Sequence, residues 1–251
     1  MNESDAAQPA PAKPSSTIIV LRDGKLHPEM LMVKRRAGDA FGESYAFPGG
    51  VLDADESTAR DFCLGITADE ANATLGVPDG GLDYYSAGIR ELFEETGVLL
   101  AQDSAGKWAC GSALSADLRT RVDKGLLPWS EFLSQQSLCI ACGSLHYFAH
   151  WETPFDLPKR WTTRFFMTRL PTGQDACHDG IETTDSRWMS AADLLSEEAR
   201  GEIRVPYPTV KTLEKLKSFE TIDDLFAWAR EQQVAGIGLN RLDTVPGMTN
   251  R

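Results

Sequence analysis

The chain has 251 residues, of which 42% are hydrophobic and 25% are charged, which is ordinary for a globular protein with one substantial core. Its formal net charge of −12 argues against a general nucleic-acid binder, because such proteins need clustered lysine and arginine to release counterions. No apolar run reaches the roughly eighteen residues that a membrane span needs, so we expect no membrane-spanning segment.

The two ends of the chain and its cysteines bear on where the protein works. Residues 1–16 are rich in Ala, Pro and Ser and lack an apolar stretch, so we expect a disordered lead-in rather than a signal peptide. The ending Thr249-Asn250-Arg251 is not a peroxisomal signal of the Ser-Lys-Leu type. Five cysteines, an odd number, indicate reduced thiols. A cytoplasmic location is the simplest expectation.

The elements predicted after residue 16 mix strands and helices without strict alternation. Strands over residues 17–21 and 29–33 flank a polar turn, and a glycine-punctuated loop then leads to Phe47-Pro48-Gly49-Gly50. A helix over residues 84–95 ends at Gly97, which is typical of a C-terminal cap. We therefore expect a mixed sheet with helices on both faces. The remaining predicted helices cover residues 68–75, 115–135 with a break near 125–128, 191–199, 209–218 and 222–233, and the remaining strands cover 98–101, 145–151, 162–170 and 182–189.

Three glutamates on the predicted helix over residues 84–95 suggest a metal site. Glu91, Glu94 and Glu95 stand at positions i, i+3 and i+4, which share one helix face. Carboxylates stacked in this way repel one another, and a hard divalent cation such as Mg²⁺ or Mn²⁺ relieves that repulsion. Arg90 lies four residues before Glu94 and can hold part of the group in place. For the glutamates alone, a solvated acidic helix face would be the better interpretation.

The residues around these glutamates resemble the motif of the Nudix hydrolase superfamily. That motif begins with a glycine followed after five residues by a glutamate, which Gly50 and Glu56 match. Its second half, Arg-Glu-hydrophobic-x-Glu-Glu-x-Gly-hydrophobic, matches residues 90–98 at every defined position. Between Glu56 and Arg90 lie 33 residues where the family has seven, an insertion of 26. A similarly split motif is known from a branch that includes a peroxisomal coenzyme A diphosphatase.

The resemblance covers roughly residues 15–235 and implies an α/β fold of the α+β type, the Nudix α/β/α sandwich with a mixed sheet. It implies a hydrolase domain over residues 17–205, in which residues 57–84 form an insertion within the motif. Extra helices over residues 206–235 are expected to pack on this domain, followed by a tail over residues 236–251. The insertion could serve as a lid, a wall of the substrate site, ordinary packing or the surface of a homodimer.

By the same resemblance, the reaction is hydrolysis of a diphosphate bridge with the help of Mg²⁺ or Mn²⁺. Glu91, Glu94 and Glu95 are the expected metal ligands, together with the backbone carbonyl of Gly49. The base that activates water is either Glu91 or Glu94, or else a residue of a distant loop, for which Glu182 is the candidate. An exposed charge at a strand end explains Glu182 equally well.

The substrate implied by the branch is coenzyme A or an acyl-coenzyme A, a small nucleotide diphosphate. The expected substrate-side residues are Arg35, Arg36, Phe47, Gly50 and Glu56, although Asp53 or Asp55 could take the place of Glu56 as the acidic partner. One tryptophan, for instance Trp161, could stack on adenine. ADP-ribose, NADH and nucleotide sugars remain competing substrates, and a nucleotide-binding module without catalysis is the competing function. The complete glutamate trio favours the enzyme.

Overall fold

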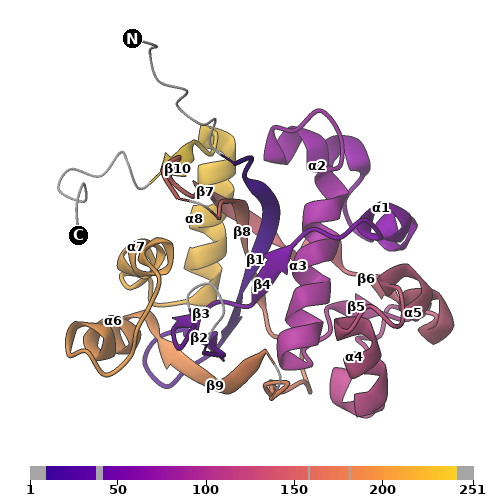
Figure 1. Cartoon of the computed structure of the whole chain (residues 1–251), viewed down its shortest axis with the longest axis horizontal. Helices are drawn as coiled ribbons and strands as arrows, with labels where there is room; N and C mark the ends of the chain where they lie inside the picture. Colours follow the sequence, from indigo (N-terminus) through magenta and orange to yellow (C-terminus); the bar gives the residue numbers. More distant parts are fainter. Residues whose placement is uncertain (1–9, 38–41, 158, 181, 242–251) are drawn as a thin grey trace, which may run out of the picture.

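The computed structural model describes residues 10–37, 42–157, 159–180 and 182–241, and Figure 1 shows a central sheet with helices on both faces. The sheet is mixed, with the order β10-β7-β8-β1-β2-β3, while β4 also pairs with β1 and β9 with β2. The predicted fold class is therefore confirmed. The strands are β1 (Lys13–Arg22), β2 (Glu29–Arg35), β3 (Tyr45–Ala46), β4 (Gly49–Val51), β7 (His146–Glu152), β8 (Trp161–Arg169), β9 (Thr183–Ser190) and β10 (Leu239–Arg241), with β5 (Ala101–Gln102) and β6 (Cys139–Ile140) in a separate pair.

The helices fall into two layers on either side of this sheet (Figure 1). The layer around α3 also contains α1, α2, α4 and α5, whereas α6, α7 and α8 lie on the opposite side. None of the helices formed by the described residues is long and apolar enough to cross a membrane. The helices are α1 (Glu56–Ala59), α2 (Ala68–Leu75), α3 (Gly81–Thr96), α4 (Ala116–Asp123), α5 (Trp129–Gln136), α6 (Ala191–Ala199), α7 (Tyr207–Leu216) and α8 (Ile222–Ala235).

Strand β1 lies in the middle of the sheet and separates two hydrophobic cores. Ile18 and Val20 pack in the core beneath α3, whereas Ile19 and Leu21 pack in the core beneath α7 and α8. Because side chains alternate along a strand, a strand buried on both faces reads as a continuous apolar run. All four of these side chains are fully buried.

Helix α3 approaches β1 closely, and a glycine makes this approach possible. A Cβ on Gly88 would lie 2.8 Å from Ser16 Oγ and 3.0 Å from Ile18 Cδ1. The helix ends at Gly97, which adopts φ 72° and donates its N–H to the carbonyl of Phe93. The predicted glycine cap is confirmed, and the acidic end of α3 is held in a fixed place against the sheet.

The strand predicted over residues 98–101 is wrong except at its last residue, where β5 begins. An amide side chain takes the place of a neighbouring strand. Leu99 N donates to Gln174 Oε1, and Gln174 Nε2 donates to the carbonyl of Leu99, both at 2.8 Å. These two bonds satisfy the backbone of Leu99 as a strand partner would.

Two predicted boundaries also fall inside strands. β1 begins at Lys13, so residues 13–16 are ordered and the expected lead-in is shorter than predicted; residues 1–9 lie outside the described residues. The expected tail contains β10, whose Asn240 Nδ2 donates to the carbonyl of His150 at 2.9 Å. Both segments are polar, and hydrogen bonds between strands hold them where apolar periodicity gave no signal.

The insertion expected over residues 57–84 is folded against α3. Its helix α2 starts at a capping box formed by Thr67 and Glu70. Arg60 binds Asp83 through Nε and Nη2, at 2.6 and 2.8 Å. Residues 81–84 are the first turn of α3, so the insertion leads directly into the helix that carries the glutamates.

Candidate active site

Arg90 lies at the centre of a carboxylate cluster on α3. Its Nε donates to Glu56 Oε1 at 2.8 Å, and its Nη1 donates to Glu94 Oε2 at 2.7 Å and lies 3.0 Å from Glu91 Oε1. Its Nη2 donates to the carbonyl of Val51 at 3.0 Å. One buried guanidinium therefore connects both halves of the split motif and β4.

Glu95 belongs to a second group, centred on Arg35 and the turn at Gly49. Arg35 Nη2 donates to the carbonyl of Gly49 at 2.6 Å and lies 3.3 Å from Glu95 Oε1. The backbone N–H of Gly49 donates to Glu95 Oε2 at 3.1 Å. Gly49 has φ 153°, and a Cβ there would lie 2.3 Å from the carbonyl oxygen of Ser16. Only glycine fits this position beside β1, and it is the N–H of this residue that binds Glu95.

Gly50 brings the same turn into contact with Glu91. A Cβ on Gly50 would lie 2.4 Å from the carboxylate carbon of Glu91, a distance at which atoms overlap. The absence of a side chain therefore lets the Glu91 carboxylate lie directly against the turn. The pair Gly49-Gly50 contacts both Glu91 and Glu95, one glycine each.

Burial raises the pKa of Glu56, Glu94 and Glu95. It raises the pKa of Glu56 to about 7, of Glu94 to about 9 and of Glu95 to about 8, although the neighbouring arginine lowers each of them. The two groups together form one carboxylate cluster with four carboxyl groups and two guanidinium groups. This cluster is short of positive charge when all four carboxyl groups are ionised. A cation would remove this deficit.

The donor set fits a hard divalent cation. Glu56 Oε2 and Glu95 Oε1 are buried and accept no hydrogen bond of regular geometry, although Arg35 Nη2 lies 3.3 Å from Glu95 Oε1, and oxygen ligands suit Mg²⁺ or Mn²⁺. Within the described part of the chain, however, no three acidic, histidine or cysteine side chains converge in a metal-binding arrangement. Arg90 pairs with Glu91 and Glu94, and Arg35 pairs with Glu95. The Nudix hydrolases that the split motif resembles generally use divalent metal ions.

Glu182 lies just before β9, and its charge interacts with the cluster. Burial and then the negative charges of Asp123 and Glu91 raise the pKa of Glu182, while Arg35 lowers it. Asp123, at the end of α4, also raises the pKa of Glu94. No sequence pattern indicates Asp123, because only the packing of α4 against α3 brings it near Glu94 and Glu182.

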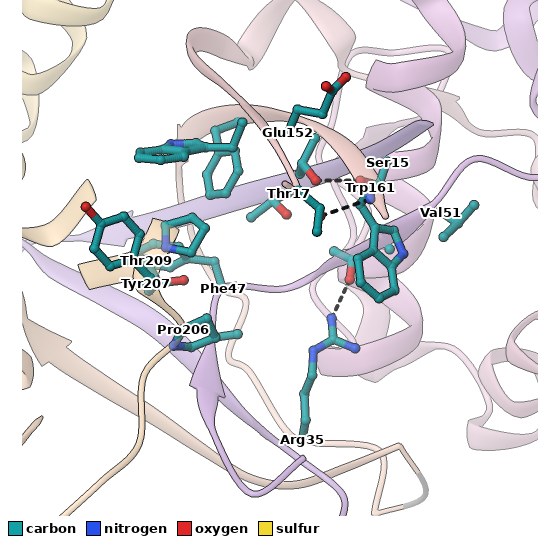
Figure 2. A pocket seen from close by; sticks show the side chains of 18 of the residues that line it. Ser15, Thr17, Arg35, Phe47, Val51, Glu152, Trp161, Pro206, Tyr207 and Thr209 are labelled. Atoms are coloured by element: carbon teal, nitrogen blue, oxygen red, sulfur yellow. Dashed lines mark hydrogen bonds between the residues drawn. The ribbon is translucent and has the colours of Figure 1, made fainter. Parts of the chain in front are cut away.

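A pocket of about 300 Å³ opens beside the Gly49-Gly50 turn. In Figure 2, Phe47 and Tyr207 lie on one side of it and Trp161 on the other, and Arg35 reaches toward the turn from below. The pocket faces the layer of α7, whereas the carboxylates project from α3. The Gly49-Gly50 turn therefore separates the pocket from the carboxylates. Its main aromatic and apolar lining comes from Phe47, Trp151, Leu157, Trp161, Phe165 and Tyr207.

The predicted substrate-side residues separate into two groups. Arg35, Phe47 and Gly50 line the pocket, as does Trp161. Arg36 is not among the lining residues; its backbone N–H donates to the carbonyl of Glu182. Sequence reasoning missed the contribution of residues 206–209, which reach the pocket at the start of α7.

Glu56 lies in the carboxylate cluster rather than in the pocket. Of its two alternatives, Asp55 accepts hydrogen bonds from Ser130 N and Oγ, at 2.8 and 3.0 Å, and so holds the first turn of α5. Asp53 bonds the backbone of its neighbour Ala54. Neither aspartate bonds Arg90, so Glu56 is the acidic residue that the motif spacing brings to it.

Comparison with known proteins agrees with this geometry. Residues 62–216 match the family model described as NUDT19 Nudix domain. Human acyl-coenzyme A diphosphatase NUDT19 is 25% identical over 247 residues, which cover 83% of this chain and 65% of that protein. A nudix hydrolase of Caenorhabditis elegans is 25% identical over 197 residues, covering 77% of this chain and 57% of that protein. The chain thus spans less than two thirds of either curated relative.

Among solved structures, a NUDIX hydrolase from Alicyclobacillus acidocaldarius superposes with a TM-score of 0.73 at 25% identity, covering 86% of this chain and 96% of that one. The family model, the relatives and the fold agree with the split motif. The chain belongs to the NUDT19 Nudix domain family of Nudix hydrolases.

Proposed function

We propose that this chain is a metal-dependent diphosphatase whose substrate is coenzyme A or an acyl-coenzyme A, cleaved to 3′,5′-ADP and (acyl-)phosphopantetheine. The observation that carries the proposal is the Gly49-Gly50 turn, which borders the pocket on one side and contacts the carboxylates on the other. A diphosphate lying over this turn would have an apolar pocket for one end of the substrate and the charged cluster at its bridge. The name of the human relative supports the choice of substrate.

The roles of the residues follow from their positions. Glu91, Glu94 and Glu95, with the carbonyl of Gly49, would hold Mg²⁺ or Mn²⁺, which supplies positive charge at the phosphate oxygens and lowers the pKa of the attacking water. Arg90 keeps Glu94 in place, and Arg35 offers its guanidinium to a phosphate oxygen at the pocket mouth.

Glu182 is the proposed general base. It accepts a proton from water as the water oxygen bonds to one phosphorus and the bridging P–O bond breaks, and the leaving phosphate keeps the bonding electrons. A base must carry no proton before the reaction, and the raised pKa of Glu182 makes it a stronger proton acceptor than an ordinary glutamate.

The pocket has one property that bears on the 3′-phosphate of coenzyme A. Among the described residues that line it, Arg35 is the one cation; its Nη2 binds the carbonyl of Gly49 and pairs with Glu95, and the rest of its guanidinium is assigned to the diphosphate. We therefore infer that the 3′-phosphate lies outside the pocket, and we expect dephospho-coenzyme A to be cleaved at a rate within about tenfold of coenzyme A, since no buried charge pair would depend on that phosphate.

The experiment is a mass-spectrometric turnover screen of the purified chain with Mg²⁺ or Mn²⁺. The panel comprises coenzyme A, dephospho-coenzyme A, acyl-coenzyme A, ADP-ribose, NADH and nucleotide sugars, and Glu94→Gln serves as the control for contaminating activity. Formation of 3′,5′-ADP supports the proposal. Turnover of the other compounds alone would refute the substrate, and no turnover despite calorimetric binding of metal and nucleotide would favour a binding module.

A further inference from the structure

The loop before β9 is docked on the C-terminal end of α3. The backbone N–H of Cys177 donates to the carbonyl of Thr96 at 2.8 Å. The hydroxyl of Thr183, whose single proton is shared with Asp179, lies 3.2 Å from the carbonyl oxygen of Glu95. The last carbonyls of a helix have no partner within the helix, so these bonds satisfy groups that would otherwise be free. The loop therefore uses the end of α3 as its attachment point.

Asp179 fixes the backbone of the loop at Glu182. Its Oδ2 accepts the N–H of Glu182 at 2.8 Å. Its Oδ1 accepts the N–H of Thr183 at 2.8 Å and the hydroxyl of Thr183 at 2.7 Å. Three donors converge on one carboxylate, so the backbone on both sides of the Glu182 carbonyl is held in one conformation.

Arg119 of α4 joins the helix and the loop with a single guanidinium. Its Nε donates to the carbonyl of Glu94 at 2.9 Å, and its Nη1 donates to the carbonyl of Cys177 at 3.0 Å. A cation at the C-terminal end of a helix is favourable, because the free carbonyls there carry partial negative charge. The planar fork of arginine presents N–H groups at a fixed separation, which suits two carbonyls better than the single nitrogen of lysine.

The charges around Glu182 explain why such an attachment is needed. Asp123, Glu91 and Asp179 all oppose ionisation of Glu182, and the negative end of the α3 dipole lies nearby. Arg35 is the neighbouring cation on the side of the sheet. Repulsion among these groups would move the loop away from α3 unless bonds to the helix held it.

We propose that Arg119, together with Asp179 and Thr183, is a positioning residue that holds Glu182 against the acidic face of α3. The proposal rests on the role given to Glu182 in the proposed function. It extends the active site to α4 and to the loop, neither of which belongs to the split motif.

The test is a double-mutant cycle between Arg119→Gln and Glu182→Gln, with kcat and KM measured on the best substrate of the screen. We expect Arg119→Gln to lower kcat by about tenfold or more with KM nearly unchanged, because misplacement of a catalytic group by about 1 Å has effects of this size. In the Glu182→Gln background the same substitution should cause no further loss, since Arg119 acts through Glu182. Additive losses would mean that Arg119 acts on α3 itself, and would overturn the proposal.

Two further variants, together with thermal unfolding, separate an effect on the position of Glu182 from a loss of fold. Thr183→Val preserves shape and removes the hydroxyl that contacts both Glu95 and Asp179, and we expect the same non-additivity with Glu182→Gln. Arg121→Gln, on the same helix, is the matched control and should leave kcat unchanged. Thermal unfolding of each variant identifies loss of fold. If Glu182→Gln retains full kcat while Glu94→Gln does not, the role of Glu182 fails and this inference with it, whereas the proposed hydrolase activity stands.

Discussion

Arg90 and Glu56 lie 34 positions apart in the sequence, yet they form a buried ion pair with Nε 2.8 Å from Oε1. The insertion separates Glu56 and Arg90 along the chain, but its fold brings the two residues back together in space. The pair therefore restores in three dimensions the continuity that the motif lacks in sequence. Because Arg90 also binds Glu94, the pair fixes one of the proposed metal ligands as well.

Removal of the guanidinium should be costly to stability. Arg90→Met would leave Glu56 and Glu94 buried without their cation, and such losses cost about 3–5 kcal/mol. The measurement is the free energy of unfolding from urea titration. Arg22→Met is the control, because the pair of Arg22 with Glu29 is partly exposed and should be worth about 1 kcal/mol or less. Equal losses in the two variants would contradict the central place given to Arg90.

The glutamates at the end of α3 should be essential for turnover. Glu94→Gln and Glu95→Gln should each lower kcat at least about 10²-fold, because a lost ligand removes charge stabilisation from the transition state. Glu131→Gln, on the exposed side of α5, should leave kcat unchanged. Full activity of both α3 variants would rule out the proposed metal site.

Stability of the metal-free protein should fall as the pH rises. The pKa values of Glu56, Glu94 and Glu95 in the folded protein, about 7, 9 and 8, lie above the ordinary value of 4.5. Above about pH 4.5 the unfolded chain releases these protons first, so the folded state loses its advantage progressively until about pH 9. We expect Tm to decrease over this range in chelator-treated protein.

Addition of Mg²⁺ or Mn²⁺ should raise Tm more at about pH 8 than at about pH 6, because the ligands must lose protons before they bind. The double substitution of Glu94 and Glu95 by glutamine should flatten both responses. Glu131→Gln should leave them as they are. A Tm that does not change with pH in the metal-free protein would mean that the three glutamates have ordinary pKa values in the folded state.

Sequence reasoning went furthest where a local pattern decides the structure. Neighbours a few positions apart determine the helix face shared by Glu91, Glu94 and Glu95, the cap at Gly97 and the helix over residues 191–199. Helical periodicity and capping residues therefore reveal these features in the sequence. The strand predicted over residues 98–101 failed because Gln174, far along the chain, supplies its partner.

The parts of the site that escaped prediction depend on contacts between distant segments. Asp123 and Arg119 reach α3 because α4 packs against it, and nothing in the sequence around them resembles a motif. The pocket likewise combines β8 with the start of α7. Motif spacing could predict the glutamates of α3, whereas the groups that surround them follow from tertiary packing alone.

A single methyl group on Gly50 offers the sharpest test of how the turn and α3 fit together. In Gly50→Ala the new Cβ would lie 2.4 Å from the Glu91 carboxylate carbon, so the carboxylate must move. We expect kcat to fall by about tenfold or more, while Tm of the metal-free protein changes little, because a displaced carboxylate can turn toward solvent. Gly238→Ala is the control, since a Cβ there meets nothing within 4 Å. If Gly50→Ala and Gly238→Ala are equally active, Glu91 does not need its place against the turn, and the metal ligands are then Glu94 and Glu95 without it.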